Sequence, residues 1–584
     1  MSRGVAESAA NPESSAAVAA YRRMLPVALR RVLASRYAPQ TRAKAKRQLA
    51  ALAETRRRAR VQGALLSERL RALSQAPDRT VVLAAGRARI ALVDPQLTPV
   101  RARRAGLQSV TGALAEAGVD HFCLRGRERG RSVVAVADDD RGKACAALRE
   151  LCASEPGYVT APGRPAGRHL APADDPRIWR RIAESSGRGL RLTWFRTEPT
   201  GRLILAERYG CEVQFWPGAD GQLLAPRPNG VTAAVDAAAP PVTVEDATSW
   251  GYGPVRVRTR AEFAHPLPQD IAFPIDAVYT WVDGDDPAWL RRRAAYAGQT
   301  GPAYHDEAAN PARYADHDEL RYSLRSLAAH APWIRRVYLV TDDQVPPWLD
   351  TTHPGLCVIS HRDIFDDSRA LPTFNSHAIE SRLHHIDGLA EHFLYFNDDV
   401  FLGRETVPQD FFLAGGLTKF FPSPALVPFG PPDPDDTPVS AAAKNNRLLI
   451  ERCFGTTPVH KFKHTPHPLR RSVLTEIEAR FRAEHRATGG HRFRSQDDIA
   501  VASSLHHYYA FHTGRATPAR IRYAYLDLSE PNVERRLWQL LATRDRTAFC
   551  VNDTVSQAAD SQGQTVLLRP FLQAYFPVPS PYER

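Results

Sequence analysis

The strongest chemical signal in this 584-residue sequence is a pair of adjacent carboxylates, Asp398 and Asp399, which follow the apolar run 393–396 and Asn397. Like charges at this spacing repel each other and raise one pKa. A divalent cation relieves the repulsion, and carboxylate oxygens suit Mg²⁺ or Mn²⁺, with Ca²⁺ as a further candidate. The alternative is a surface turn in which an aspartate caps a helix. Acidic pairs of this kind are typical of nucleotide-sugar enzymes, whose metal offsets charge on the departing phosphate.

Two histidines in the basic segment KFKHTPHPLRR form a second candidate group. His464 and His467 are three residues apart, but Pro466 between them disfavours a helix that would present both to one metal ion. We therefore expect them on a loop, as hydrogen-bond donors or acid/base groups. The alternative is that both are structural histidines.

A third group lies in the segment HRFRSQDDIAVASSLHHYY. Arg492 and Arg494 precede Asp497 and Asp498, after which a helix is expected. Arginine binds phosphate oxygens through two nitrogens, and the acids would orient it or help to hold a metal. The alternative is an ordinary helix N-terminus with its favoured acids. The proline-rich segment 422–438 is expected to lack regular structure, as a lid, an acceptor-binding loop or a plain surface loop.

The elements that must position these groups begin near Ile271. Strand-like runs at 275–282, 335–343, 357–365 and 392–403 alternate with helical patterns at 316–333 and 375–386. This alternation predicts an α/β domain with a mainly parallel sheet. Ligands bind beyond the carboxyl ends of such strands. Six acids fall at these ends: Asp283, Asp285, Asp342, Asp343, Asp398 and Asp399.

The first half of the chain gives no comparable signal. Between Thr80 and about Val244, short strand-like runs and one or two helices indicate a separate α/β or α+β domain, with no Gly-rich phosphate loop. The segment from Tyr21 to about Leu73 predicts basic amphipathic helices. Most of the net charge of +13 lies between Tyr21 and Arg60, where Glu54 is the only acid. A solvated face, an anionic membrane surface and nucleic acid are the alternatives for this arm.

Composition excludes several classes of protein. Hydrophobic residues make up 43% and charged residues 24%, which excludes wholesale disorder. The sequence has no apolar run of membrane-spanning length and no pattern of a signal peptide. The seven cysteines form no Cys-x-x-Cys pair, which argues against a disulfide scaffold and a cysteine zinc site. We therefore expect a cytoplasmic protein. If the basic arm binds an anionic membrane surface, we expect that surface to be the inner face of the membrane.

Five segments, in this order, resemble the four conserved regions of the Stealth family of sugar-1-phosphate transferases. They are IDAVYTWVDGDDPAW, DELRYSLRSLAAHAPWIRRVYLVTDDQVPPWL, LPTFNSHAIESRLHHIDGLAEHFLYFNDDVFLG, HTPHPLRRSVL with FRSQDDIAVASSL, and AFCVNDT, between about Ile275 and Thr554. The family includes bacterial capsular polysaccharide phosphotransferases and the catalytic subunit of the lysosomal-enzyme N-acetylglucosamine-1-phosphotransferase. The resemblance covers roughly half of the chain.

The resemblance implies a fringe-like, GT-A-related nucleotide-sugar-binding fold with a divalent metal. It also implies that a sugar-1-phosphate moves from a UDP-sugar to a hydroxyl of a cell-surface or capsular polysaccharide, with release of UMP. The metal would be Mg²⁺ or Mn²⁺. A dimer is one candidate assembly, and no specific nucleic-acid partner is expected.

The family's functional positions fall on particular residues of this sequence. The resemblance implies that Asp398, Asp399 and Asp498 hold metal, and that Asp399 is ligand or general base. The other implied catalytic residues are Glu380, His464, His467 and Arg494. The implied nucleotide loop comprises Trp281, Val282, Gly284, Asp285 and Asp286. Asp283 stands where many relatives carry Asn. The loop therefore predicts a nucleotide contact, but it does not predict which sugar the nucleotide carries.

Together these observations predict four parts: a disordered start and basic arm over 1–75, an N-terminal domain over 76–262, a catalytic domain over 263–524, and a C-terminal region over 525–584 that packs on it. Two alternatives to sugar-1-phosphate transfer are a conventional glycosyltransferase that releases UDP, and a membrane-surface or nucleic-acid binder that acts through its basic arm.

Overall fold

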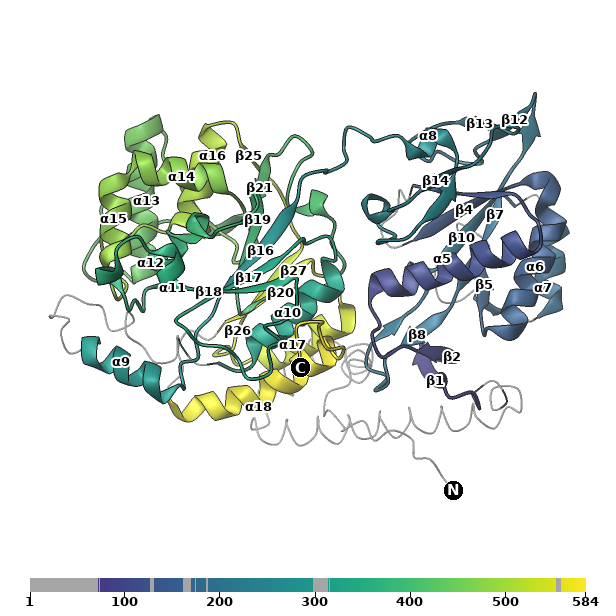
Figure 1. Ribbon diagram of the computed structural model, residues 1–584. Helices are drawn as coiled ribbons and strands as arrows, with labels where there is room; N and C mark the ends of the chain where they lie inside the picture. Colours follow the sequence, from purple (N-terminus) through teal and green to yellow (C-terminus); the bar gives the residue numbers. More distant parts are fainter. Residues whose placement is uncertain are drawn as a thin grey trace, which may run out of the picture. The chain divides into compact units, whose positions relative to one another are not determined.

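The computed structural model describes residues 72, 74–125, 131–160, 170–173, 175–184, 187–297, 314, 316–552 and 558–584. Thr554 and the expected basic arm, apart from residues 72, 74 and 75, lie outside these residues. The chain divides into two units (Figure 1). Unit 1 runs up to Leu267 and includes Gln573–Val578, whereas unit 2 comprises Pro268–Leu572 and Pro579–Arg584. None of the described helices combines the length and the apolar character that a membrane span requires.

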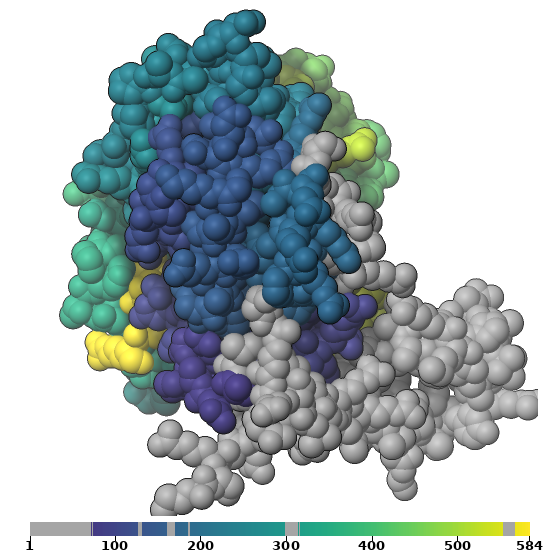
Figure 2. All heavy atoms as spheres, turned by 90° about the vertical axis from the view of Figure 1, so that its right-hand side faces the viewer, coloured from purple at the N-terminus to yellow at the C-terminus, as the bar shows by residue number. Residues whose placement is uncertain are grey.

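Unit 1 is built on a six-stranded mixed sheet in the order β3-β4-β10-β7-β5-β6. Strand β10 pairs parallel to β4 and antiparallel to β7. Helices α5, α6 and α7 pack in sequence beside one another, and α6 and α7 contribute to the blue surface that faces the viewer in Figure 2. The helices are α5 (Pro99–Glu116), α6 (Arg141–Ser154), α7 (Pro176–Glu184) and α8 (Ala261–Ala264).

The strands of unit 1 are short, as the sequence predicts for this half. They are β1 (Arg79–Ala84), β2 (Arg87–Val93), β3 (His121–Leu124), β4 (Ser132–Ala137), β5 (Tyr158–Thr160), β6 (Ala171–Pro172), β7 (Gly189–Thr193), β8 (Phe195–Thr197), β9 (Ile204–Leu205), β10 (Cys211–Trp216), β11 (Gly218–Ala219), β12 (Gln222–Leu224), β13 (Ala234–Asp236), β14 (Val242–Val244) and β15 (Val257–Thr259).

Unit 2 contains the predicted parallel sheet, which confirms the α/β class. Its five strands lie in the order β18-β17-β16-β19-β24, and only β24 runs antiparallel to its neighbour. They are β16 (Ile275–Thr280), β17 (Val337–Thr341), β18 (Leu356–Ser360), β19 (His392–Asn397) and β24 (His467–Arg470). A second sheet, β20-β27-β26, comprises β20 (Val400–Leu402), β26 (Tyr523–Asp527) and β27 (Ala548–Asn552).

Side chains of the central strands alternate between two cores, as the two-residue period of a strand requires. In β19, Phe393 and Tyr395 pack into one core, while Leu394 and Phe396 pack into the other. Because both faces are covered, the strand is apolar throughout. Its polar residues therefore begin only at its carboxyl end.

Helices and short strands complete unit 2. The helices are α9 (Pro287–Ala297), α10 (Glu319–His330), α11 (His361–Ile364), α12 (Ser376–Glu380), α13 (Pro438–Phe454), α14 (Arg471–Arg480), α15 (Arg482–Gly490), α16 (His506–His512), α17 (Val533–Thr543) and α18 (Ala558–Tyr575). The remaining strands are β21 (Thr418–Phe420), β22 (Pro422–Leu426), β23 (His460–Phe462) and β25 (Ala516–Pro518).

Three local expectations need correction. The helix expected over 375–386 stops at Glu380, and a separate 3₁₀ turn follows at Leu383–His385. The proline-rich segment begins with a regular strand, β22, which pairs with β23; prolines are tolerated on such an edge strand. The helix expected directly after Asp498 begins with a π-helical turn at Val501–Leu505 and continues as α16. The seven cysteines, all within the described residues, form no disulfide.

Candidate active site

The acidic pair lies between the five-stranded and the three-stranded sheet of unit 2. Strand β19 ends at Asn397, Asp398 and Asp399 follow, and β20 begins at Val400. The backbone N–H of Val551, in β27, donates to the carbonyl of Asp399 at 3.1 Å. The backbone N–H of Asp399 donates to Asp398 Oδ1 at 3.1 Å. The pair therefore forms a half-buried turn between two strands and does not cap a helix.

Asp398 belongs to a larger cluster of acids that the sequence analysis did not identify. Burial and the carboxylates of Asp399 and Asp316 raise the pKa of Asp398 to about 8. Burial, together with Asp398 and Asp316, also raises the pKa of Glu319, at the start of α10, well above its usual value. The indole Nε1–H of Trp281 donates to Asp316 Oδ2 at 3.2 Å. The run DHDE at 316–319 is the only sequence signal for these two acids, and it is equally typical of a helix N-terminus.

Asp399 carries two further side-chain contacts. His464 Nε2 lies 3.1 Å from Asp399 Oδ1, and Cys550 Sγ lies 3.1 Å from Asp399 Oδ2. Burial lowers the pKa of His464, but the negative charge of Asp399 outweighs it and the net shift is upward. Burial and Asp399 raise the pKa of Cys550 well above its usual value, so the residue stays a thiol and donates to the carboxylate. Cys550, in β27, is another residue that the sequence analysis did not single out.

The chemistry of these donors fits a divalent cation. Asp316, Glu319, Asp398 and Asp399 place four carboxyl groups in one neighbourhood, and the raised pKa values of Asp316, Glu319 and Asp398 reflect burial and uncompensated negative charge. Ligand atoms of Asp399, His464 and Cys550 also lie within 4.8 Å of one another. Because Cys550 is a protonated thiol, the carboxylate oxygens are the better ligands. Oxygen ligands favour hard ions such as Mg²⁺ and Mn²⁺.

His467 is the first residue of β24 and lies opposite Tyr395 of β19, so the expectation of a loop holds for His464 and is wrong for His467. Its Nδ1 lies 3.0 Å from Nε2 of His507, in α16. Burial lowers the pKa of both rings well below the usual value, so both are neutral at pH 7. Among the residues that the structure describes, the buried Nε2 of His467 has no hydrogen-bond partner, which leaves this atom available to a ligand.

Glu380 and Arg494 adjoin the same neighbourhood. Glu380 Oε2, at the end of α12, accepts a hydrogen bond from Ser503 Oγ at 3.0 Å. Arg494 Nη2 donates to Ser376 Oγ, at the start of α12, at 2.7 Å. Burial raises the pKa of Tyr395, Glu380 and Asp398 raise it further, and Arg494 opposes the rise. The structure thus brings together Glu380, Asp398, Asp399, His464, His467 and Arg494.

Asp498 has different surroundings. Its carboxylate is fully buried and accepts hydrogen bonds from the side chains of Asn375 at 2.8 Å, His377 at 3.3 Å and His491 at 2.7 Å. The backbone N–H of Ser495 donates to it at 3.0 Å. Burial alone would raise its pKa, but hydrogen bonds from His377 and His491 lower the value to about 2. Asp498 therefore ties the start of α12 to the segment that carries Arg494.

The loop after β16 is held in one conformation by Gln344. The side chain of Gln344 accepts from the backbone N–H of Asp283 at 2.9 Å and donates to Asp286 Oδ2 at 3.0 Å. At Gly284, an added Cβ would lie 1.9 Å from the carbonyl oxygen of Tyr314, so this position admits only glycine. Val282 packs beside Trp289, and Asp285 donates its backbone N–H to Asp283 Oδ1 at 2.9 Å. Trp281 links the loop to the acid cluster through Asp316.

The two acids after β17 have other partners. Asp342 accepts from Arg292 at 2.7 Å, and Asp343 pairs with Arg362 at 3.3 Å. The prediction that acids converge at the strand ends therefore fits Asp398 and Asp399 better than it fits Asp342 and Asp343, which pair with arginines.

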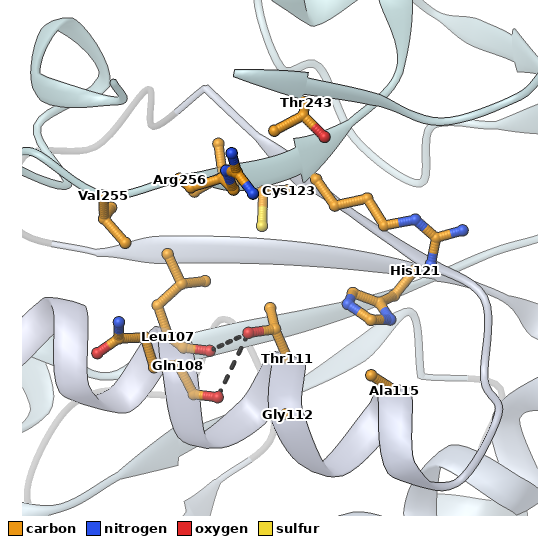
Figure 3. Close-up of a pocket in the computed structure, with 12 residues that line it drawn as sticks. Leu107, Gln108, Thr111, Gly112, Ala115, His121, Cys123, Thr243, Val255 and Arg256 are labelled. Atoms are coloured by element: carbon orange, nitrogen blue, oxygen red, sulfur yellow. Dashed lines mark hydrogen bonds between the residues drawn. The ribbon is translucent and has the colours of Figure 1, made fainter. Parts of the chain in front are cut away.

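Unit 1 contains a cavity of about 390 Å³ between α5 and β15 (Figure 3). Its charged lining groups have partners within unit 1. Arg256 pairs with Glu245 at 2.9 Å, and Arg258 pairs with Asp120 at 2.6 Å. The cavity brings together no set of groups comparable with the acid cluster of unit 2.

The fold and these groups define a class: an α/β protein with an acidic, cation-fitting site at the carboxyl end of a parallel sheet. Four conserved regions of one family match the second half of the chain: Stealth protein conserved region 1 at residues 273–301, region 2 at 313–420, region 3 at 463–511 and region 4 at 539–584. The chain belongs to the Stealth family, and the resemblance found in the sequence is confirmed.

Similar proteins extend over the whole chain. It is 48% identical to "Exopolysaccharide phosphotransferase SCO2594" of Streptomyces coelicolor, over 98% of this chain and 99% of the relative. It is 50% identical to SCO6023 of the same organism, described in the same words, over 99% of each chain. It is 35% identical to "Exopolysaccharide phosphotransferase CpsY" of Mycobacterium tuberculosis, over 87% of this chain and 93% of the relative.

Solved structures show a more distant likeness. The galactosyltransferase LgtC matches 52% of this chain and 96% of its own, with 11% identity and a TM-score of 0.27. A mouse xyloside xylosyltransferase matches 48% of this chain and 98% of its own, with a TM-score of 0.23. Overlaps this loose do not identify a function.

Proposed function

We propose that this protein transfers a sugar-1-phosphate from a UDP-sugar to a hydroxyl group of a cell-surface or capsular polysaccharide. The acceptor oxygen attacks the β-phosphorus, the bond between that phosphorus and the bridging oxygen breaks, and UMP leaves. The C1–O bond of the sugar stays intact. The observation that carries the proposal is the clustering of Asp398 and Asp399 with His464, His467 and Arg494. The membership in the Stealth family and the full-length relatives named exopolysaccharide phosphotransferases support it.

Asp398 and Asp399 are the proposed ligands of Mg²⁺ or Mn²⁺, with Asp316 and Glu319 as neighbouring acids. The bound cation would neutralise charge on the diphosphate and act as a Lewis acid. The raised pKa of Asp398 supports this assignment, because a carboxyl group in uncompensated negative surroundings gains a favourable partner when a cation binds.

Asp399 is also the proposed acceptor of the proton from the attacking hydroxyl. His464 and Cys550 each contact a different oxygen of Asp399, and this fixes the plane of the carboxylate. Each oxygen retains a lone pair for a further contact. A positioned base of this kind typically contributes a factor of roughly 10² to 10⁴ in rate.

His467 and Arg494 are the proposed partners of the β-phosphate and the departing UMP. When the Nε2–H of His507 donates to Nδ1 of His467, the Nε2–H of His467 points away from this bond and can donate to a phosphate oxygen. Arg494, held by Ser376, supplies a permanent positive charge. Buried Glu380, held by Ser503, balances that charge and contributes to the raised pKa of His464. Phosphoryl transfer depends mainly on positioning and charge stabilisation of this kind.

The loop of Trp281, Val282, Gly284, Asp285 and Asp286 is the proposed nucleotide contact. It follows strand β16 of the parallel sheet and joins the acid cluster through Trp281 and Asp316. For Asp498, the geometry supports a positioning role rather than metal ligation, because its carboxylate accepts four hydrogen bonds within the protein. It would keep Arg494 beside α12.

The nucleotide product tests this proposal. Purified protein is incubated with a panel of UDP-sugars, Mg²⁺ or Mn²⁺ and polysaccharide acceptors, and UMP is separated from UDP. UMP that depends on acceptor, cation and Asp399 supports sugar-1-phosphate transfer. Acceptor-dependent UDP would instead identify a conventional glycosyltransferase on the same fold. Deletion of residues 1–75 separates catalysis from localisation: an enzyme retains turnover, whereas a membrane-surface or nucleic-acid binder loses its function.

A further inference from the structure

A second group of metal-ligand side chains lies in the helical part of unit 2 and shares no residue with the candidate active site. His384 and His385 belong to the 3₁₀ turn Leu383–His385, and Glu478 belongs to α14. His384 Nε2 lies 2.5 Å, and His385 Nε2 2.8 Å, from the same oxygen, Glu478 Oε2. Ligand atoms of all three residues lie within 4.8 Å of one another.

A third imidazole faces the same carboxylate from α15. His485 Nδ1 lies 3.6 Å from Glu478 Oε1, and the ring of His485 packs edge-on against that of His384. His384 also packs edge-on against His385, with ring centroids 4.3 Å apart. Three imidazoles from two segments therefore surround one carboxylate.

The outer hydrogen bonds show which nitrogens carry protons. His385 Nδ1 lies 2.9 Å from the carbonyl oxygen of Ile364, and His485 Nε2 lies 2.9 Å from that of Ser381. A carbonyl only accepts, so both of these nitrogens are N–H donors. In its neutral form, each ring then directs a bare lone pair at Glu478. Such an arrangement is repulsive unless a proton or a cation lies between the nitrogen and the carboxylate.

The surroundings resemble the outer shell of a metal site. Ligating histidines usually donate their second N–H to a carbonyl or carboxylate, which fixes the ring and the tautomer. His385 and His485 both do so. Arg382 Nη1 donates to Glu478 Oε1 at 2.8 Å and leaves Oε2 to His384 and His385. The positive charge of Arg382 opposes a cation, and Asp366, 3.9 Å from its guanidinium, partly offsets that charge.

We propose that His384, His385, Glu478 and His485 form a Zn²⁺ site. Imidazole nitrogens with one carboxylate oxygen are ligands that Zn²⁺ prefers, and a tetrahedral site with ligand bonds of about 2.0–2.1 Å separates its ligand atoms by roughly 3.3 Å. Small movements of these side chains reach that spacing. The ion would join the 3₁₀ turn to α14 and α15, directly after α12, which carries Glu380. This site goes beyond the proposed function, because it requires no sugar chemistry.

Zinc content of the full-length protein tests the proposal. The protein is stripped with a chelator and dialysed against limiting Zn²⁺, and bound zinc is then measured by elemental analysis together with the thermal midpoint of unfolding. The variants are Glu478→Gln, His385→Gln and His485→Gln. The matched control is His512→Gln, which changes a histidine of α16 that contacts Thr456. Asp399→Asn removes one member of the other group of metal-ligand residues, which comprises Asp399, His464 and Cys550.

We expect one zinc per chain in the wild type, the His512→Gln protein and the Asp399→Asn protein, with a thermal midpoint several degrees higher when zinc is present. We expect the three cluster variants to lose zinc affinity by more than the roughly 10- to 100-fold that outer-shell changes cause. Retained far-ultraviolet circular dichroism shows that the variants fold. Three variants are used so that the test remains valid if one of them fails to fold. Zinc that is absent from the wild type, or that is lost in Asp399→Asn and kept in the cluster variants, overturns the proposal. Absence of zinc from the wild type does not contradict sugar-1-phosphate transfer, and zinc lost only in Asp399→Asn would agree with a cation at Asp399.

Discussion

Asp398 and Asp498 are two carboxylates of the same unit that have opposite surroundings. Asp398 is beside other acids, and its pKa is raised to about 8, whereas Asp498 receives hydrogen bonds from His377 and His491, and its pKa is lowered to about 2. A carboxylate whose charge the protein already compensates stabilises the fold. A carboxylate whose charge is left uncompensated lowers the stability of the fold but can bind a ligand that supplies the missing charge. The comparison separates the proposed cation site from the framework that supports it.

The largest expected effect comes from the acidic pair. Asp399→Asn keeps the shape of the side chain but removes its charge and its capacity to take a proton. We expect turnover to fall by at least about 10³-fold, within the range for loss of a positioned base, measured as acceptor-dependent UMP release. The thermal midpoint of unfolding should change little.

Asp387→Asn is the matched control for this change, because Asp387 is exposed and follows the 3₁₀ turn. It should retain wild-type turnover. A folded Asp399→Asn protein with wild-type turnover would refute the role of Asp399.

A change at Asp498 should affect mainly stability. Asp498→Asn removes the charge that His377 and His491 compensate, and we expect unfolding to become easier by about 2 to 4 kcal/mol, measured by urea denaturation at pH 7. Because the folded pKa lies below the unfolded value, this stabilisation is present above about pH 4 and is lost as the pH falls towards 2. A difference between wild type and variant that does not shrink over this interval would contradict the assignment.

In the cation-free protein, Asp398 should change the free energy of unfolding with pH in the opposite direction to Asp498. Its folded pKa lies above the unfolded value, so its ionisation destabilises the fold as the pH rises from about 4 to about 8. We expect Asp398→Asn to be more stable than the wild type at pH 8 by about 1 to 3 kcal/mol without a cation, after allowance for solvent screening.

The affinity for Mn²⁺ should depend on the ionisation of Asp398. Below pH 8 the ion displaces a proton from Asp398, so the affinity should rise about 10-fold per pH unit and level off above pH 8. Isothermal titration calorimetry in buffers of different ionisation enthalpy measures both the affinity and the released proton. Binding that is independent of pH between 6 and 8 would show that Asp398 is not the ligand.

The smallest expected effect concerns the link between the nucleotide loop and the acids. Trp281→Phe retains most of the packing and removes the N–H that donates to Asp316. We expect a loss of about 1 kcal/mol, seen as a roughly 5-fold rise in KM for the UDP-sugar with little change in kcat. A pure kcat effect would mean that the hydrogen bond acts on the acids and not on the nucleotide loop.

The sequence predicts the parts of the site that depend on local pattern. The apolar run before Asn397 predicts a buried strand, and Asp398 and Asp399 follow from its end. The order of the segments predicts the parallel sheet. Each of these signals lies within one element and its flanking turn.

The remaining residues could not be predicted because only tertiary packing distinguishes them. Asp316 and Glu319 have the same local pattern as ordinary acids at a helix start, and Cys550 lies 151 residues from the carboxylate that it contacts. Asp498 lies in a segment typical of phosphate binding, yet its partners Asn375 and His377 come from α12. Hydrogen-bond satisfaction, which separates Asp398 from Asp498, is a property of the folded chain.

The most direct test of the central claim follows the β-phosphate itself. The wild-type protein is given a UDP-sugar labelled with ³²P at the β-phosphorus, together with acceptor and Mn²⁺, and the label is located after separation of polymer from nucleotides. We expect label in the polysaccharide, joined to the sugar at C1, and unlabelled UMP in solution. Label recovered as UDP, with sugar in the polymer, would contradict it.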